Sequence, residues 1–147
     1  MEPVTDISPG TPTGSIAIVV SDADVDRFLA AMHADLPIFA RPAKGERRRV
    51  PPELVPKLGM MATIQDFCIA TFGQNLRAKQ TFRFVAPVYV GMQVHGNGRF
   101  AGSFEKRGRR YVSFEAEYRD HDGRLLVVDQ RTQCVIGESF AFKEKTK

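Results

Sequence analysis

The chain has 147 residues, of which 43% are hydrophobic and 26% are charged, and its formal net charge is +4. This composition is typical of one globular domain that buries a core without metal or disulfide support, and it argues against wholesale disorder. No apolar run approaches the roughly 20 residues of a membrane-spanning helix. The acidic N-terminus is unlike a signal peptide. We therefore expect a cytoplasmic protein that does not bind membranes.

The N-terminal part of the chain changes character at residue 15. Residues 1–14 are rich in Pro, Gly, Ser and Thr, and we interpret them as a flexible lead-in. Residues 15–147 are expected to form a single domain. Its first segment, SIAIVV at residues 15–20, is β-branched and short, which favours a strand.

A helix and a loop are predicted next. Ser21 is a candidate N-cap, and Val25, Phe28, Leu29 and Met32 follow at helical spacing, so the pattern predicts an amphipathic helix that ends near His33. The segment 35–49 contains Pro and Gly among polar residues and is predicted to be a loop.

The longest apolar segment runs from Leu54 to Phe72 and is apolar on nearly all sides, which is typical of a helix buried over most of its surface. Pro56 would remove a backbone hydrogen bond inside such a helix. The sequence therefore predicts either a kink at Pro56 or a helix that begins near it, with Gly73 as the C-terminal stop.

From Leu76 onward the apolar period changes to two, and turn signals at Gly91, 106–108 and 120–123 separate four candidate strands. The G-N-G at 96–98 is interpreted as a bulge. A sheet that wraps around one central helix would bury the apolar faces of both, so we predict an α+β fold.

Cysteine and histidine give no sign of a metal centre. Cys68 and Cys134 lie in apolar patterns and are expected to be free, buried thiols. No spacing of His, Cys and Asp is typical of a metal site, and we expect no cofactor. His95 and His121 are expected in exposed turns.

Positive charge gathers in two clusters: Lys44, Arg47, Arg48 and Arg49, and Lys106, Arg107, Arg109 and Arg110. Such clusters are either solvated loops or sites that attract a phosphate-rich partner, such as the nucleotide of coenzyme A. No recognisable motif for binding nucleic acid accompanies them, so no nucleic-acid partner is expected.

Four stretches together resemble the MaoC-like hot-dog family, most closely the N-terminal dehydratase domains of double hot-dog proteins. They are FLAAMHADLPIF (28–39), VPPEL (50–54), TFRFVAPVYVGMQV (81–94) and YVSFEAEYRDHDGRLLVVDQRT (111–132). The resemblance implies a hot-dog fold and an acyl thioester of coenzyme A or acyl-carrier protein as ligand. It also implies (R)-specific enoyl-thioester hydratase or 3-hydroxyacyl-thioester dehydratase activity, and a homodimer or a heterodimer with another hot-dog subunit.

The catalytic pattern of that family is altered in this chain. In its enzymes an Asp and a His activate water, while a backbone N–H at the start of the central helix polarises the thioester. Alignment through Pro37 places Phe39 at the His position and Pro52 at the position of the N–H donor. Phenylalanine cannot transfer a proton, and proline has no N–H. Both changes resemble non-catalytic hot-dog halves, which pair with a catalytic half and shape the acyl tunnel.

Two sets of carboxylates could replace the lost groups. Asp35, with His33 beside it, is a candidate catalytic dyad, although a helix-terminal His next to a solvated Asp is also consistent with the sequence. Asp66, on the central helix, resembles the carboxylate of hot-dog thioesterases; alternatively, it belongs to a polar stripe that faces solvent or a dimer partner.

Three hypotheses remain open at this point: a hydratase or dehydratase that uses Asp35 and His33, a non-catalytic subunit, and a thioesterase that uses Asp66. The residues expected to bind substrate are Phe39, Pro52, Arg47, Arg48 and Arg49.

Overall fold

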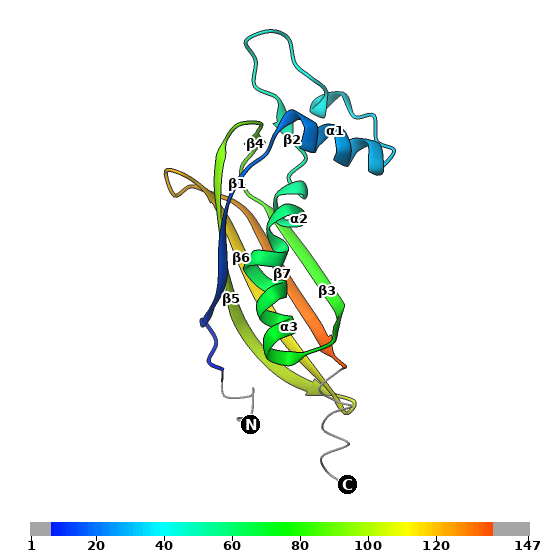
Figure 1. Cartoon of the computed structure of the whole chain (residues 1–147), viewed down its shortest axis with the longest axis vertical. Helices are drawn as coiled ribbons and strands as arrows, with labels where there is room; N and C mark the ends of the chain where they lie inside the picture. Colours follow the sequence, from blue (N-terminus) through cyan, green and yellow to red (C-terminus); the bar gives the residue numbers. More distant parts are fainter. Residues whose placement is uncertain (1–6, 137–147) are drawn as a thin grey trace.

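A large antiparallel sheet wraps around a long central helix in the computed structural model, which describes residues 7–136 (Figure 1). The predicted α+β arrangement is thus confirmed. The five-stranded sheet has the order β1-β5-β6-β7-β3. Its strands are β1 (Pro12–Val19), β3 (Asn75–Phe84), β5 (Gln93–Lys106), β6 (Arg109–Asp120) and β7 (Leu125–Val135).

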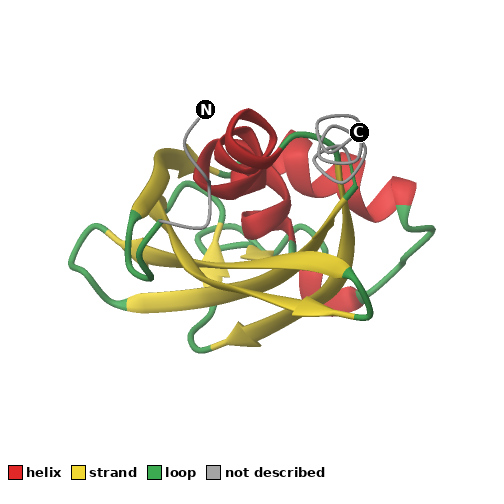
Figure 2. Cartoon of the chain, turned by 90° about the horizontal axis from the view of Figure 1, so that it is seen from below, coloured by secondary structure: helices red, strands yellow, loops and turns green. Residues whose placement is uncertain are grey.

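The central helix lies on one side of this sheet (Figure 2), and the remaining elements lie at one end of it (Figure 1). A short sheet pairs β2 (Arg49–Val50) with β4 (Val88–Tyr89). The helices are α1 (Asp22–Ala31), the 3-10 turn η2 (Pro37–Phe39), and a central helix made of α2 (Leu54–Met60), the π-helical segment η3 (Met61–Gln65) and α3 (Asp66–Phe72). Within residues 7–136, no helix is both long enough and apolar enough to cross a membrane.

The first strand and helix form where the sequence predicts them, with small shifts. The strand begins at Pro12, earlier than the expected residue 15. Ser21 caps α1: its hydroxyl accepts a hydrogen bond from the Asp24 N–H at 3.1 Å, and the Asp24 carboxylate accepts one from the Ser21 N–H at 3.0 Å. The helix ends at Ala31, because His33 has a left-handed φ of 52°.

The central helix begins at Leu54 and ends at Phe72. Pro56 therefore lies in its first turn, where a backbone N–H would have no partner inside the helix, so the proline is tolerated. Gly73, with a φ of 79°, ends the helix as predicted. The π-helical segment in its middle was not expected from the sequence. The helix is buried on one face only, because Leu58, Met61 and Ile69 are exposed on the other.

Glycines allow this helix to lie directly against the sheet. A Cβ atom on Gly98 would overlap the carbonyl oxygen of Thr63, and one on Gly14 would overlap that of Ala62. No extra residue is found at 96–98 of β5, so the bulge predicted there is wrong. The β5–β6 register breaks between Phe100 and Gly102, and the β1–β5 register breaks in β1, between Pro12 and Gly14, opposite Gly98 and Arg99. Close approach of the helix backbone, rather than a turn in the strand, accounts for Gly98.

Tyr118 fills the space beneath the helix. It is fully buried, and a Cβ atom on Gly59 of the helix or on Gly96 of β5 would collide with its ring. Its hydroxyl lies 3.2 Å from the Thr63 hydroxyl, which in turn donates to the Gly59 carbonyl at 2.9 Å. Burial raises the pKa of Tyr118 to about 12, so this hydroxyl stays neutral.

A polar cluster lies between the central helix and β7, which carries Asp129, Arg131 and Gln133. Arg131 Nε donates to Asp129 Oδ2 at 2.8 Å, and both side chains are buried. Burial raises the pKa of Asp129, although the neighbouring Arg131 charge opposes that shift. Gln133 donates to Gln65 of the helix at 3.0 Å. The helix and β7 are therefore joined here by hydrogen bonds in place of apolar packing.

Both cysteines are free, as predicted. Cys68 is buried, and burial raises the pKa of its thiol to about 11. Cys134 is only half-buried, because it lies on the sheet face that points away from the helix. His121 lies in an exposed turn as expected, whereas His95 is exposed but lies within β5.

Replacing Gly98 with Ala should destabilise the fold by about 1–3 kcal/mol or more, because the new methyl group must displace the helix backbone at Thr63. Denaturant unfolding measures this change. Asn97→Ala is the matched control: Asn97 is the exposed neighbour in the same strand, and its replacement should alter stability by less than about 0.5 kcal/mol. Equal stability of the two variants would contradict this account of the glycine.

Candidate functional site

A pocket of about 310 Å³ opens where the central helix begins. Five segments contribute to it: η2, β2, the residues before α2, the end of β3 and the start of β4. Its lining residues are Ile38, Phe39, Arg49, Val50, Pro52, Phe84, Val85, Ala86, Pro87 and Val88. The lining is apolar except at Arg49.

Pairing of two short strands brings the walls of this pocket together. Val50 of β2 is opposite Val88 of β4, and both side chains are buried. This pairing connects the segment after η2 to the segment after β3, which are far apart in the sequence. The resulting space presents mainly hydrocarbon, which suits an apolar ligand.

Phe39 and Pro52, which the sequence singles out as altered catalytic positions, both line the pocket. The structure thus brings together the two positions that correspond to proton transfer and to thioester polarisation in the family pattern. Neither residue can perform its step, because a phenyl ring does not titrate and the proline nitrogen carries no hydrogen. Arg49 is the charged lining residue.

The three consecutive arginines have three different environments. Arg49 lines the pocket, while Arg47 is exposed and its guanidinium lies 4.3 Å from the centre of the Tyr89 ring. Arg48 is buried, with only 4% of its side chain accessible. The sequence groups all three as ligand-binding residues, but the contacts of Arg48 are all within the protein.

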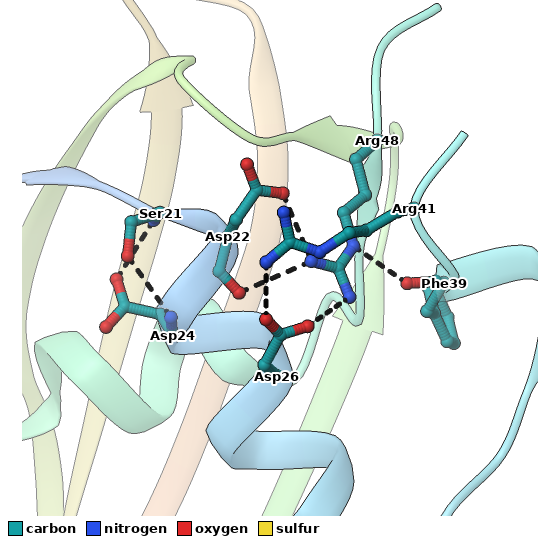
Figure 3. Close-up of polar contacts among 7 residues, drawn as sticks. All are labelled: Ser21, Asp22, Asp24, Asp26, Phe39, Arg41 and Arg48. Carbon is teal, nitrogen blue, oxygen red and sulfur yellow. Dashed lines mark hydrogen bonds and ion pairs between the residues drawn. The ribbon is translucent and has the colours of Figure 1, made fainter. Parts of the chain in front are cut away.

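Arg48 joins three segments of the chain (Figure 3). Its Nε donates to the Phe39 carbonyl at 2.9 Å. Its two terminal nitrogens donate to the Asp22 carboxylate at 3.1 Å and to the Asp26 carboxylate at 2.8 Å. The guanidinium therefore fixes the position of η2, and with it the Phe39 wall of the pocket, relative to α1. We call these contacts the Arg48 clamp.

A second arginine strengthens the acidic side of the clamp. Arg41 donates to the other oxygen of Asp26 at 2.7 Å (Figure 3). Hydrogen bonds from Arg41 and then from Arg48 lower the pKa of Asp26. Asp26 therefore remains ionised, and able to hold both guanidinium groups, at any pH near neutrality.

His33 and Asp35 do not form a cleft. Both are exposed, and neither lines the pocket. Among the hydrogen bonds and ion pairs of residues 7–136, none joins His33 to Asp35. The structure therefore leaves the two side chains in the solvated arrangement that the sequence also allowed.

Asp66 is the first residue of α3, and its side chain is exposed. It too lies outside the pocket lining. In the described chain, then, Asp66 belongs to the outer, exposed stripe of the central helix. Residues 7–136 contain no group of three or more His, Cys, Asp or Glu side chains that could hold a metal ion.

Two features of the site escaped sequence reasoning. One was the pocket wall formed by residues 84–88, although they lie within the TFRFVAPVYVGMQV stretch (81–94) that contributes to the family resemblance. The other was the acidic side of the clamp. Asp22 and Asp26 are four residues apart on one helix, so they share a face, and this spacing was the available signal.

The comparisons with known proteins agree on the fold. The family described as FAS1-like, dehydratase domain region, matches residues 8–129. A structure of the C-terminally truncated HadBC (3R-hydroxyacyl-ACP dehydratase) complex from Mycobacterium tuberculosis is similar, with a TM-score of 0.75 and 18% identity over 88% of this chain and 98% of that one. No curated protein matches at the level of sequence.

Two further structures show the same likeness. The (R)-hydratase of A. caviae involved in PHA biosynthesis has a TM-score of 0.69 and 18% identity, over 87% of this chain and 96% of that one. The ChsH1-ChsH2 complex from Mycobacterium tuberculosis has a TM-score of 0.65 and 12% identity, over 88% of this chain and 98% of that one. At these identities the likeness establishes the hot-dog fold, which confirms the expectation from the sequence.

Replacing Arg48 with Ala should destabilise the protein by about 2–4 kcal/mol, since it removes hydrogen bonds to two carboxylates and leaves the Phe39 carbonyl without its donor. Arg41→Ala is the control, because it removes an exposed ion pair to the same Asp26 and should have an effect below about 1 kcal/mol. Urea unfolding of both variants makes the comparison. Similar losses would show that burial of Arg48 is unimportant.

The clamp should also weaken in acid. Because the pKa of Asp26 is lowered in the folded protein, its contribution is complete above the pKa of an unfolded Asp, about 3.9, and is lost as the pH falls through the lower folded value. The difference in unfolding free energy between the wild type and Asp26→Asn should therefore be constant above about pH 5 and shrink below about pH 4. A constant difference down to pH 2 would contradict this assignment.

Proposed function

Because the chain belongs to the FAS1-like dehydratase domain family, we propose that it is an acyl-thioester-binding subunit. In this proposal the chain shapes a pocket for the acyl group, and another hot-dog subunit supplies the groups that transfer protons. The ligand is an acyl thioester of coenzyme A or of acyl-carrier protein.

The chemistry of the pocket carries this proposal. Among its described lining residues there is no Asp, Glu, His, Cys, Tyr, Ser or Lys. Hydration of an enoyl thioester needs a group that activates water and another that stabilises charge on the thioester oxygen. Phe39 and Pro52 supply neither function, so the pocket can bind an acyl chain but lacks the means to add water to it.

The charges beside the pocket support a thioester with a phosphorylated carrier. Arg49 lies in the lining, and Arg47 is exposed on the neighbouring Tyr89 ring. Guanidinium groups bind phosphate oxygens well, and both coenzyme A and the carrier-protein arm contain phosphate. The apolar wall would then contact the acyl chain while the arginines face the carrier.

The hydratase hypothesis with Asp35 and His33 gains no support from geometry, because both side chains are exposed outside the pocket. The thioesterase hypothesis requires Asp66 to face a ligand. Asp66 lies on the exposed stripe of the helix, so a ligand could reach it only at a surface shared with a second subunit. We therefore place both hypotheses behind that of a non-catalytic subunit.

The pure protein should bind a short acyl-CoA yet leave the absorbance of an enoyl-CoA unchanged. Phe84→Ala should weaken acyl-CoA binding about tenfold, because it removes apolar contact area worth about 1–2 kcal/mol. Phe104→Ala is the control, since Phe104 is equally exposed at 48% but lies in β5, outside the pocket lining. Titration calorimetry measures both affinities.

Three results would contradict the proposal. Loss of enoyl absorbance on mixing with the pure protein would show that the chain is a hydratase by itself, and Asp35→Asn would then identify the base. Absence of any acyl-CoA binding would show that the pocket does not serve this ligand. Thiol release that disappears in Asp66→Asn would instead establish the thioesterase hypothesis.

A further inference from the structure

A row of apolar side chains crosses the face of the large sheet that points away from the central helix. Its members are directly opposite one another on four adjacent strands: Leu76 of β3, Cys134 of β7, Tyr111 of β6 and Phe104 of β5. Gln133 donates a hydrogen bond to the central helix at 3.0 Å, so its neighbour Cys134 points to the other face of the sheet. Residues that are directly opposite share a face. We call these four side chains the outer row.

The two ends of the outer row are open to solvent. Leu76 is 62% exposed and Phe104 is 48% exposed. The rings of Phe104 and Tyr111 stack on each other, with their centres 5.1 Å apart. Strand β1 pairs with β5 only as far as Arg99, so among the described residues no strand lies beside Phe104 on that edge. Another molecule can therefore reach the Phe104 ring, and exposed apolar surface of this kind is typical of interaction sites.

A hollow of about 230 Å³ adjoins the outer row. Its lining residues are Lys79, Thr81, Ala101, Ser113, Phe114, Glu115, Gln130, Arg131 and Thr132. Thr132 lies two positions before Cys134 in β7 and therefore points to the same face of the sheet. The hollow and the outer row are thus parts of one surface.

The hollow contains donors for a carboxylate. The hydroxyls of Ser113 and Thr132 lie 3.1 Å apart, and the exposed Lys79 is opposite Thr132. The acidic lining residue, Glu115, forms an ion pair with Arg99 of the neighbouring strand, which compensates its charge. The lysine and the hydroxyls are therefore suited to an Asp or Glu side chain of a partner.

Positive charge lies on both sides of the outer row. Lys106, Arg107 and Arg109 form the tip of the β5–β6 hairpin on one side, and Lys79 lies on the other. All four side chains are exposed, and none takes part in the ion pairs found within residues 7–136. Figure 1 shows the hairpin tip at the opposite end of the sheet from β2 and β4, which contribute to the pocket. A ligand in the pocket therefore leaves these cations available to a partner.

An acidic protein segment suits this surface better than a nucleic acid does. A single strand of nucleic acid needs successive rings on which its bases stack, and cations that follow its backbone. Here the two aromatic rings stack on each other, and Glu115 and Glu117 interrupt the positive charge on the same face. A segment that combines apolar and acidic side chains matches both the row and the cations beside it. A second copy of this chain would instead bring its own cations against them.

We propose that the outer row, the hollow and the hairpin tip form a docking site for an extended segment of a different protein, in which acidic residues flank apolar ones. Apolar side chains of the segment pack against Phe104 and Leu76. One carboxylate enters the hollow beside Lys79, and others pair with Lys106 and Arg109. This inference goes beyond the proposed function, because the site lies away from the pocket.

Selection from a phage-displayed library of random peptides, each of about 12 residues, tests this site directly. Peptides enriched on the wild type should combine acidic and apolar residues, and fluorescence anisotropy measures the affinity of the most enriched one. Phe104→Ala should weaken its binding at least about tenfold, because this change removes the exposed ring of the outer row. Phe84→Ala is the matched control, since Phe84 is equally exposed at 48% but lies in the pocket lining. The control should bind the peptide as the wild type does.

Charge reversal provides a second measurement on the same peptide. The double variant Lys79→Glu, Arg109→Glu should bind it at least about tenfold more weakly at low ionic strength. The difference from the wild type should shrink near 1 M salt, where charges are screened within about 3 Å. Lys44→Glu, Arg124→Glu reverses two exposed charges outside the site and should have little effect. Circular dichroism and urea unfolding verify that all variants fold.

Four results would overturn the inference: no enriched peptide, enriched peptides without an excess of acidic residues, wild-type affinity in Phe104→Ala, or equal losses in the two charge variants. Tighter binding of single-stranded poly(U) RNA than of the selected peptide would also overturn it, in favour of a nucleic acid. Acyl-CoA titration separates this inference from the proposed function. A failed peptide selection with intact acyl-CoA binding would remove only the docking site.

Discussion

The close approach of the central helix to the sheet is the constraint on which the rest of the structure depends. Carbonyl oxygens of Ala62 and Thr63 lie against Gly14 of β1 and Gly98 of β5, at positions where no side chain would fit. The π-helical segment occupies this point of contact. Because the middle of the helix is fixed there, its N-terminal end is also fixed, and Pro52 comes to lie in the pocket lining.

The buried side chain of Arg48 holds the Phe39 wall of the pocket in place. Arg48 belongs to a basic run that looks like a ligand-binding feature, yet its hydrogen bonds hold η2 to α1. Its planar guanidinium donates in three directions at once, which a lysine ammonium on a flexible stem would do poorly. The neighbours Arg47 and Arg49 remain at the surface and beside the pocket. Within this run of three arginines, Arg48 therefore has a structural role, whereas Arg47 and Arg49 place positive charge at the surface and beside the pocket.

The pocket lacks groups for acid–base catalysis among its described lining residues. The pocket offers apolar surface and an arginine but no residue that transfers a proton. Under the proposed function, a hot-dog subunit that carries catalytic residues would complete the pocket. The hot-dog structures similar to this chain include two described as complexes, HadBC and ChsH1-ChsH2.

The sequence by itself determined the order and type of the main elements, because apolar periodicity, the Ser21 cap and the turn glycines act between residues that are near in the chain. It also placed Phe39 and Pro52 together, through a resemblance of motifs. Only the tertiary structure decided that Arg48 is buried, that residues 84–88 form the second pocket wall and that Gly98 supports the helix. Each of these features depends on contacts with backbone or carboxylate groups that are far away in the sequence and that packing brings close. Neither local periodicity nor residue type contains that information.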